Sequence, residues 1–428
     1  MVLTLTDEEQ GFLDGRAGEA VATAMRMVVA LARMVGAERL LPVTRAHIDS
    51  CLYHGRAGLD FAQALADAGG QVRVPTTLNV SSLDLRHPDR VRLAGEERAA
   101  AAALMDAYVA MGCRPTWTCA PYQLDDRPEF GEQVAWAESN AIVFANSMLG
   151  ARTERYGDFI DICAALTGRV PDAGLHRDEA RRGRVLFDVS GLPGALLAEH
   201  VVFPLVGHVV GAMTGTRVPV IDGLLPTATE DDGKALGAAA ASSGGVAMFH
   251  AVGITPEAPS RDAAFHGRPP EEVVTVTTAM LRDARSELTT TDTTELAGVS
   301  VGTPHFSVAE FARLHSLFRS HGAPSRVPFH VNTGRDVWDE VGRRGWQEEL
   351  LVAGVVPVTD TCTYITPVLD SDRPGAVMTD SAKWAYYAPG NIGVDAVFAS
   401  LPECVASAIR GEVALDPDLG AALGGAAS

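Results

Sequence analysis

The chain has 428 residues, which is too long for one compact core and favours two lobes or one large α/β unit with insertions. Its 54 acidic against 35 basic residues give a formal net charge of −19, which argues against nucleic acid and an anionic membrane surface as partners. Hydrophobic residues make up 47% of the chain and aromatics only 6%, so the composition predicts an aliphatic core and excludes a disordered protein.

The sequence shows no pattern of a targeting or membrane segment. Its first ten residues are acidic and lack the basic region and apolar core of a signal peptide. The longest apolar runs, Val201–Val210 and Leu350–Val358, are interrupted by Pro, Gly or His and are too short to cross a bilayer. We therefore expect a cytoplasmic protein, and six scattered cysteines do not form a disulfide framework in that compartment.

Helices dominate the pattern of the first 170 residues. Thr6 and Glu9 form a capping box that opens a helix, and apolar residues then recur at helical spacing until Gly36. The other elements predicted in this part are helices over Phe61–Ala68, Gly95–Met111 and from Gly131 to about Leu149, and a strand over Gln71–Val74 that enters the polar loop Pro75–Ser82.

Strand-like segments alternate with helical ones in the rest of the chain. The stretch Arg169–Arg184 is rich in Pro, Gly and charge, so we expect one lobe over residues 1–170 and further α/β structure over 171–428. The alternation predicts an α/β fold with largely parallel sheets and flanking helices. The predicted strands are Val185–Val189, Val218–Ile221, Val246–Val252, Ala297–Val301, Val327–Val331, Val355–Val358 and Ala396–Ala399.

Two polar loops follow strands in this second part, at the strand ends where open α/β sheets bind ligands. In Gly302–Ser307, His305 is a general acid, a residue that orients a ligand, or a plain loop residue, whereas Ser307 is explained as a helix N-cap. In Thr359–Ile365, Cys362 lies among hydroxyl groups, which favours a ligand or a reactive thiol over a core residue.

Two further cysteines lie in comparable polar settings. Cys119 lies between Pro115 and Pro121, and Cys51 lies between His47 and His54. Thiolates from such loops would suit zinc or an iron–sulfur cluster if they met in space, but no CxxC pair is present and the spacing alone specifies no metal. The remaining cysteines are interpreted as structural: Cys113, Cys163 and Cys404.

Three segments carry groups that bind anions. Ser381 and Lys383 combine a hydroxyl with one of only two lysines in the chain. Arg152 would clamp a carboxylate through two hydrogen bonds, or would belong to a surface salt-bridge cluster. Three polar side chains accompany it at a helix end: the carboxylate of Glu138, the hydroxyl of Ser139 and the amide of Asn140.

The loop after Val74 is the third of these segments. Its backbone N–H groups and hydroxyls would cradle a carboxylate, or the loop would simply be a capped turn. The residues concerned are Thr76, Thr77 and Asn79. No phosphate loop of the Walker type, GxGxxG, GxSxG or HExxH is present, which argues against nucleotide-driven chemistry and serine hydrolysis.

A series of motifs in one order resembles the large, catalytic part of aconitase X. In chain order the motifs are HID-CLYHG, RVPTTLNV, MGCRPT, TCAPY, WAESNAI, GTPHFS, DTCTY, SAK and YYAPG. The resemblance runs from the first helix to about Gly411 and covers nearly the whole chain. The chain is therefore identified as a member of this family of the aconitase superfamily, with an aconitase-like, multi-lobed α/β fold.

The resemblance implies a dehydratase. One group of the family acts on cis-3-hydroxy-L-proline and another acts on mevalonate 5-phosphate. Members carry an iron–sulfur cluster and pair the large part with a small swivelling domain, either fused or separate. Because this chain ends soon after the YYAPG motif, we expect that small domain on a separate subunit.

The resemblance also implies a set of cluster ligands. Thr303 stands where mevalonate-phosphate-type sequences place a cysteine, which removes one ligand. Cys51 would then supply a third thiolate beside Cys119 and Cys362. The alternatives are an incomplete cluster, a mononuclear metal or no metal.

Dehydration of a β-hydroxy acid requires removal of an α-proton and departure of hydroxide. Iron would act as a Lewis acid on the leaving hydroxyl, and the substrate carboxylate must be held in place. We assign carboxylate binding to the loop of Thr76, Thr77 and Asn79, with Arg152 as clamp. For the proton chemistry, Ser381 with Lys383 would act as base or anion holder, and His305 as leaving-group acid.

The substrate class follows from the charge of these loops. They supply mainly Arg152, Arg155 and Lys383 as cations, which favours a small zwitterionic acid of the cis-3-hydroxy-L-proline type over mevalonate 5-phosphate. Two other functions remain open: a dehydratase or isomerase for another hydroxy acid of a specialised pathway, and a non-catalytic relative that has lost the cluster.

Overall fold

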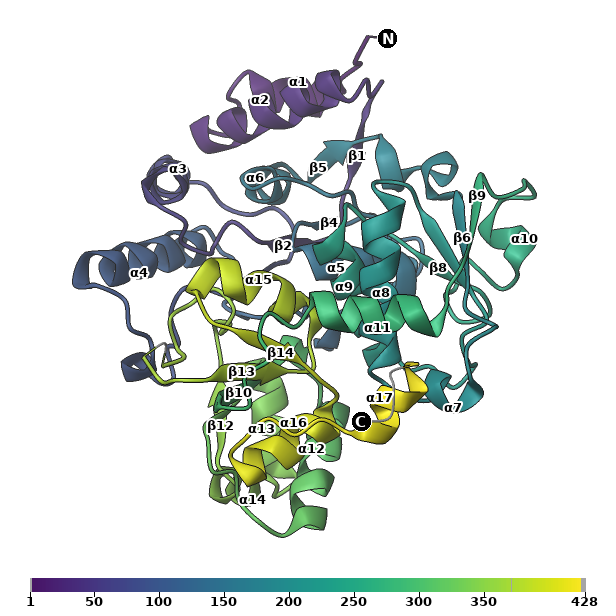
Figure 1. Cartoon of the computed structure of the whole chain (residues 1–428). Coiled ribbons are helices and arrows are strands. Elements are labelled where there is room, and N and C mark those ends of the chain that lie inside the picture. Colours follow the sequence, from purple (N-terminus) through teal and green to yellow (C-terminus); the bar gives the residue numbers. More distant parts are fainter. Residues whose placement is uncertain (1, 371, 425–428) are drawn as a thin grey trace. The chain divides into compact units, whose positions relative to one another are not determined.

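The structure is a computed structural model that describes residues 2–370 and 372–424. The chain forms two compact units (Figure 1). The first unit comprises the residues up to Leu83 and Leu93–Arg182. The second comprises Gly183 onward together with the short segment Asp84–Arg92.

The first unit is built on a three-stranded parallel sheet. Its strands are β2 (Ala46–Ile48), β3 (Thr76–Leu78) and β4 (Ala135–Trp136), in the order β3-β2-β4, and a separate antiparallel pair joins β1 (Leu40–Pro42) to β5 (Arg169–Pro171). The helices of this unit are α1 (Asp7–Leu13), α2 (Glu19–Met34), α3 (Arg56–Asp67), α4 (Gly95–Ala110), α5 (Ser139–Phe144) and α6 (Ile160–Thr167). A π-helical turn, Ala145–Leu149, continues α5.

The predicted N-terminal capping box is confirmed, because the Thr6 hydroxyl accepts a hydrogen bond from Glu9 N and the Glu9 carboxylate accepts one from Thr6 N. The helix does not run on to Gly36 as predicted. It ends at Leu13, and α2 begins at Glu19 after a turn in which Gly15 and Gly18 have φ of 81° and 96°. Backbone in this left-handed region interrupts a helix and favours glycine.

Two other predictions for this unit are wrong. Gln71–Val74 is not a strand, and the strand β3 lies instead within the stretch predicted as a polar loop. The residues from Gly131 begin with irregular chain and β4, and helix starts only at Ser139. Hydrophobic periodicity alone does not separate such short buried strands from a helix.

The second unit contains two parallel sheets. In the order β8-β7-β6-β9, the first comprises β6 (Val185–Asp188), β7 (Pro219–Asp222), β8 (His250–Ala251) and β9 (Glu272–Thr275). In the order β12-β11-β10-β13-β14, the second comprises β10 (Leu296–Phe306), β11 (Phe329–Thr333), β12 (Val355–Val358), β13 (Ala376–Thr379) and β14 (Ala396–Phe398).

Helices cover both faces of the five-stranded sheet. Apolar side chains of α12 (Val308–His321), α13 (Arg335–Arg343) and α16 (Leu401–Arg410) pack with the strands in one core, and α15 (Ala382–Ile392) lies on the other side (Figure 1). The other helices of this unit are α7 (Gly194–Leu197), α8 (Val202–Thr214), α9 (Glu230–Ser243), α10 (Arg261–Ala264), α11 (Thr278–Glu287), α14 (Gln347–Val352) and α17 (Pro417–Ala422).

The predicted α/β fold with largely parallel sheets and flanking helices is confirmed. Val355–Val358 matches β12 at both ends, whereas the strand predicted over Val246–Val252 shrinks to His250–Ala251. The strands β9 and β13 were not predicted. In the described part of the chain, no helix is both long and apolar enough to cross a membrane.

Candidate active site

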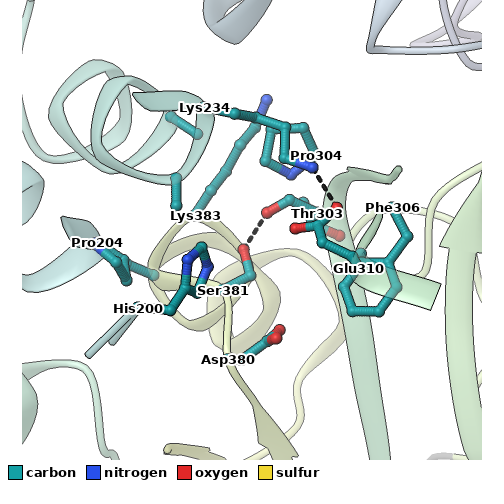
Figure 2. Close-up of a pocket in the computed structure, with 14 residues that line it drawn as sticks. His200, Pro204, Lys234, Thr303, Pro304, Phe306, Glu310, Asp380, Ser381 and Lys383 are labelled. Atoms are coloured by element: carbon teal, nitrogen blue, oxygen red, sulfur yellow. Dashed lines mark hydrogen bonds and ion pairs between the residues drawn. The ribbon is translucent and has the colours of Figure 1, made fainter. Parts of the chain in front are cut away.

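A small pocket, with a cavity volume of about 20 Å³, lies at the carboxyl end of the five-stranded sheet (Figure 2). Its walls come from the chain before α8, from α9, from β10 and from the start of α15. Three of the residues singled out in the sequence, Thr303, Ser381 and Lys383, line it. Ligands bind at this end of the strands in open α/β sheets, so the pocket is the candidate active site of the second unit.

The strand β10 reaches the pocket because it continues through the GTPHF motif, which the sequence placed in a loop. Gly302 has φ of 85°, and a Cβ atom there would lie 2.2 Å from the carbonyl oxygen of Asn332 on β11. Only glycine allows this close approach of the two strands. The register with β11 shifts between Val301 and Phe306, and this irregularity places Thr303 at the pocket.

Ser381 is the N-cap of α15. Its hydroxyl accepts a hydrogen bond from Trp384 N at 3.0 Å and donates one to the carbonyl oxygen of Thr303. These two hydrogen bonds tie the start of α15 to β10. The hydroxyl proton is therefore already engaged, which gives little support to Ser381 as the base that takes a substrate proton.

Lys383 follows two residues later and is buried. Its ammonium lies 5.7 Å from the centre of the Tyr364 ring, a cation–π arrangement. The positive charge of Lys383 also lowers the pKa values of the Cys362 thiol and of His305. Lys383 thus places positive charge beside both groups, as the prediction of an anion-holding lysine requires.

Cys362 lies in the loop after β12 and is fully buried. Its Sγ lies 3.1 Å from the Thr303 hydroxyl. Burial raises the thiol pKa to about 11, while hydrogen bonds from Thr303 and from backbone N–H groups oppose that rise. Hydrogen-bonding groups thus surround the sulfur of Cys362. The side chain at position 303 is one of them and contacts the sulfur directly.

His305 lies inside the strand and is fully buried, which corrects its prediction as a loop residue. Its Nε2 lies 3.3 Å from the carbonyl oxygen of Thr361. Burial, together with the charges of Lys234 and Lys383, lowers its pKa to about 4. A neutral imidazole bonded to a backbone carbonyl is a weak candidate for leaving-group acid.

A buried charge cluster beside the pocket was not predicted, although Lys234 was noted as one of two lysines. Lys234 lies 3.0 Å from Asp231, forms an ion pair with Glu310 and donates to the carbonyl oxygen of His305. Burial opposes its charge, but the two carboxylates raise the pKa of Lys234 above its usual value. Burial raises the pKa of Glu310 to about 7. The cluster joins α9, β10 and α12 and so fixes one wall of the pocket.

The sheet of the first unit carries its own polar face. Thr77, His47 and Trp136 are partners in register on neighbouring strands, so their side chains point to one face. Two residues further along, Asn79 and Asp49 follow on that face, and the Asn79 amide donates to the Asp49 carboxylate. The adjacent Thr76 hydroxyl donates to Val74 O, so it is already hydrogen-bonded, although Thr76 and Thr77 line the same pocket.

Three buried polar atoms on this face have no hydrogen-bond partner among the described residues: His47 Nε2, Asn79 Oδ1 and Trp136 Nε1. Nδ1 of His47 lies 2.8 Å from the Thr77 hydroxyl, and burial lowers the His47 pKa to about 3. The indole N–H can only donate and the amide oxygen can only accept. The face therefore complements a ligand with both acceptor and donor groups, and sequence patterns had not indicated His47 or Trp136.

The Glu138-Ser139-Asn140 motif forms the start of α5. The Glu138 carboxylate caps the helix by accepting from Ala141 N at 2.8 Å, and the Ser139 hydroxyl lies 3.3 Å from it. The Asn140 amide donates to the carbonyl oxygen of Cys119 at 2.8 Å. The motif thus joins the loop of Cys119 to β4, and its residues are buried or half-buried.

Arg152 is engaged in the structure of its own unit. Its guanidinium pairs with Asp178 and donates to the carbonyl oxygen of His176 at 3.1 Å. These contacts match the salt-bridge interpretation of this residue. A carboxylate clamp would require Arg152 to exchange its bond to Asp178 for one to a ligand.

Cys51 lies in surroundings that oppose a thiolate. Its Sγ is close to three backbone carbonyl oxygens, of Ile48, Asn79 and Val80, at 3.4 to 3.7 Å. Burial and the charges of Asp49 and Asp161 raise its thiol pKa well above the usual value. Only the thiolate binds metal, and this environment holds Cys51 in the thiol form. The thiol pKa of Cys362 is raised too, to about 11, although hydrogen bonds oppose the effect of burial there.

The predicted ligands are divided between the units, with Cys51 and Cys119 in the first and Cys362 in the second. In the two described stretches of the chain, no group of three or more His, Cys, Asp or Glu side chains is arranged to hold a metal ion. The surroundings of the two sulfurs differ: Cys51 faces backbone carbonyl oxygens, and Cys362 contacts the Thr303 hydroxyl.

Three family descriptions match consecutive parts of the chain: "Aconitase X first domain" over residues 2–179, the second domain over 183–286 and the third domain over 296–410. Cis-3-hydroxy-L-proline dehydratase of Pseudomonas aeruginosa is 45% identical over 94% of this chain and 69% of its own length. The protein of the same name from Hypocrea jecorina is 41% identical over 96% of this chain and 69% of its own length.

The phosphomevalonate dehydratase large subunit of Methanothermobacter thermautotrophicus is 35% identical, over 91% of this chain and 95% of its own length. The crystal structure of Thermococcus kodakaraensis aconitase X in its holo-form superposes with a TM-score of 0.85 at 30% identity, covering 95% of this chain and 100% of that one. The chain belongs to the aconitase X family.

Proposed function

We propose that this protein is the catalytic subunit of a hydro-lyase that removes water from cis-3-hydroxy-L-proline or a close analogue. The observation that carries the proposal is the 45% identity to the Pseudomonas aeruginosa cis-3-hydroxy-L-proline dehydratase over 94% of the chain, against 35% for the phosphomevalonate dehydratase large subunit of Methanothermobacter thermautotrophicus. Its dehydratase chemistry and its substrate come from these relatives.

The polar face of the first unit supports a zwitterionic substrate. Asp49 follows His47 on this face, beside the Asn79 amide oxygen that has no described partner. A carboxylate and an amide oxygen suit the ammonium group of an imino acid, and the Trp136 N–H suits a carboxylate. The nearby cations are already paired, Arg45 with Glu132 and Arg114 with Asp126, which disfavours a phosphate there.

The pocket of the second unit supports the elimination. Loss of water breaks the C–H bond at Cα and the C–O bond at Cβ, and the electron pair of the C–H bond forms the double bond. The Lys383 ammonium would stabilise the negative charge that develops on the leaving oxygen and would supply its proton. Ser381 would hold β10 and α15 in the geometry that this step requires.

An iron–sulfur cluster remains part of the proposal, with Cys362 as a ligand from the second unit and without Cys51. The support is the set of hydrogen bonds around Cys362 and its contact with Thr303. Such a cluster would act as a Lewis acid on the leaving hydroxyl. A mononuclear iron bound by the Cys362 thiolate is the alternative.

We also propose a separate small subunit and a cytoplasmic location. The match covers 95% of a relative whose name describes a large subunit, but 69% of the cis-3-hydroxy-L-proline dehydratase of Pseudomonas aeruginosa. The absence of disulfides among the six cysteines fits a reducing compartment.

The direct test is the activity of the full chain, purified without oxygen and supplied with any small subunit encoded beside it. We expect loss of cis-3-hydroxy-L-proline and formation of the cyclic imine that follows from dehydration, both visible by NMR. The trans isomer and mevalonate 5-phosphate are the comparison substrates. Turnover of mevalonate 5-phosphate alone would replace the proposed substrate, and no turnover of any of them would overturn the proposal.

A further inference from the structure

The pocket beside Ser381 contains a histidine that the mechanism above does not use. His200 lies just before α8 and lines the pocket together with Asp380 and Ser381 (Figure 2). Its side chain is 18% exposed, so it is neither a core residue nor a surface residue. It also lines a second cavity with Asp380, of about 320 Å³. The imidazole therefore stands between the active-site pocket and a larger opening.

A carboxylate fixes the orientation of this imidazole. Nδ1 of His200 lies 2.5 Å from Oδ1 of Asp232. The other oxygen of Asp232 accepts from both the backbone N–H and the hydroxyl of Thr229, each at 2.8 Å. Asp232 is thereby held in the capping box of α9, with one oxygen left for the histidine.

This arrangement determines where the proton of a neutral His200 resides. A carboxylate oxygen can only accept, so Nδ1 carries the proton and Nε2 presents a lone pair. An imidazole that is oriented by a carboxylate and has a free Nε2 lone pair is the arrangement of a general base.

Several charged groups face this imidazole. Besides Asp232, His200 interacts with Asp231 of α9 and with Asp380, which follows β13 and whose own pKa is raised by burial. Two cations, Lys234 and Arg313, also lie near Asp380.

We infer that His200 is the proton-accepting residue of this pocket, which in the proposed dehydratase takes the α-proton from the substrate at Nε2. The inference rests on the proposed function for its substrate. The C–H electron pair becomes the double bond, the hydroxide leaves with a proton from Lys383, and the imidazolium then returns its proton through solvent. Asp232 acts as a positioning residue for His200.

The kinetic test compares His200→Gln with His315→Gln. His315 is also paired with a carboxylate, Glu349, at 2.8 Å, but lies on α12 away from the pocket lining. We expect kcat to fall about 100-fold or more in His200→Gln with KM within about threefold, while His315→Gln stays close to wild type. Asp232→Asn should lower kcat less and shift the pH profile. A His200→Gln enzyme with more than half of the wild-type kcat would overturn the inference.

A second measurement does not depend on turnover. In ¹⁵N-histidine NMR spectra, with His200→Gln used for assignment, we expect an imidazole whose neutral form carries its proton on Nδ1. Asp232→Asn should change that tautomer. If the wild-type protein dehydrates none of the substrates, the proposed function fails, and these spectra alone decide the inference. A proton on Nε2 in the wild-type protein would refute it.

Discussion

The carboxyl-terminal edges of two parallel sheets, one in each unit, differ in how completely their polar groups are paired. In the five-stranded sheet, Ser381 makes two hydrogen bonds and the Trp384 indole donates to the Thr363 hydroxyl at 3.0 Å. In the three-stranded sheet, His47 and Trp136 each keep a buried polar atom without a partner among the described residues. Buried polar groups in proteins are nearly always paired. The edge in the first unit is therefore suited to a ligand that hydrogen-bonds to these unpaired atoms. At the edge in the second unit, the groups named above are already paired within the protein.

Two of the three predicted cysteine ligands, Cys362 and Cys51, allow the sharpest test of this difference. We expect Cys362→Ser to lose the bound iron and with it essentially all activity, because a donor-lined thiolate is replaced by a hydroxyl. Cys51→Ser should keep both, since a serine hydroxyl also donates to the carbonyls of Ile48 and Asn79. Iron and acid-labile sulfide content measures the effect. Equal loss in both variants would restore Cys51 to the ligand set.

Replacing the buried Lys234 tests how much its ion pairs contribute to the stability of the second unit. Lys234→Met leaves Asp231 and Glu310 buried without their cation, and breaking such a pair costs about 3–5 kcal/mol. Urea denaturation should show this loss, and the double variant Lys234→Met/Glu310→Gln should recover part of it. A decrease in the free energy of unfolding of less than about 1 kcal/mol would mean that the charge cluster contributes little to stability.

Acidification from pH 7 to pH 5 should destabilise the protein, by ~2–4 kcal/mol. Burial lowers the pKa of His47 to about 3 and of His176, His305 and His330 to about 4. Unfolded histidines titrate near 6.5, so the unfolded chain binds more protons than the folded chain over this range. The free energy of unfolding therefore decreases as the pH falls.

Three carboxyls act against this trend. Burial raises the folded pKa of Asp161 to about 6, that of Glu310 to about 7 and that of Asp380 above its usual value, so these groups favour the folded state as the pH falls. The histidines outnumber them, and the net direction is a loss. Melting temperatures at the two pH values measure it, and His176→Asn should show a shallower dependence. A higher melting temperature at pH 5 would mean that the carboxyls dominate.

The smallest effect is expected from a pair of matched tryptophan substitutions. Trp136→Phe removes an N–H without a partner and Trp384→Phe removes one that is hydrogen-bonded, while both leave a similar space. We expect Trp384→Phe to be less stable than Trp136→Phe by about 1–2 kcal/mol. Chemical denaturation of both variants without ligand gives the difference. Equal losses would mean that the Trp136 indole has a partner in solution.

Several parts of the site could be predicted because they depend on local sequence. Cys362 among hydroxyls after a strand, and Ser381 with Lys383 in one short motif, lie where the motifs indicated. Side-chain partnerships across long separations could not be predicted. The pairs His200–Asp232 and Lys234–Glu310 join residues 32 and 76 positions apart, and such contacts depend on how helices pack on the sheet.

The roles of Thr76 and Thr77 show a different limit. Their polar stretch resembled a loop, but three residues of it form a strand paired with β2. In a strand, consecutive side chains point to opposite faces. A segment predicted as a loop but folded as a strand therefore presents different hydroxyls on one face from those expected. Short buried strands without hydrophobic alternation give too little signal for such an assignment.

The segment Asp84–Arg92 makes the two units inseparable by a single cut. It lies in sequence within the first unit, but Asp84 accepts from the Thr359 hydroxyl and Arg86 pairs with Asp339, both in the second. The polypeptide thus passes between the units three times. A chain cut at Arg182 would leave the loop that carries Cys362 without its support from Asp84, so the second unit would lack part of its own fold even with every later residue present.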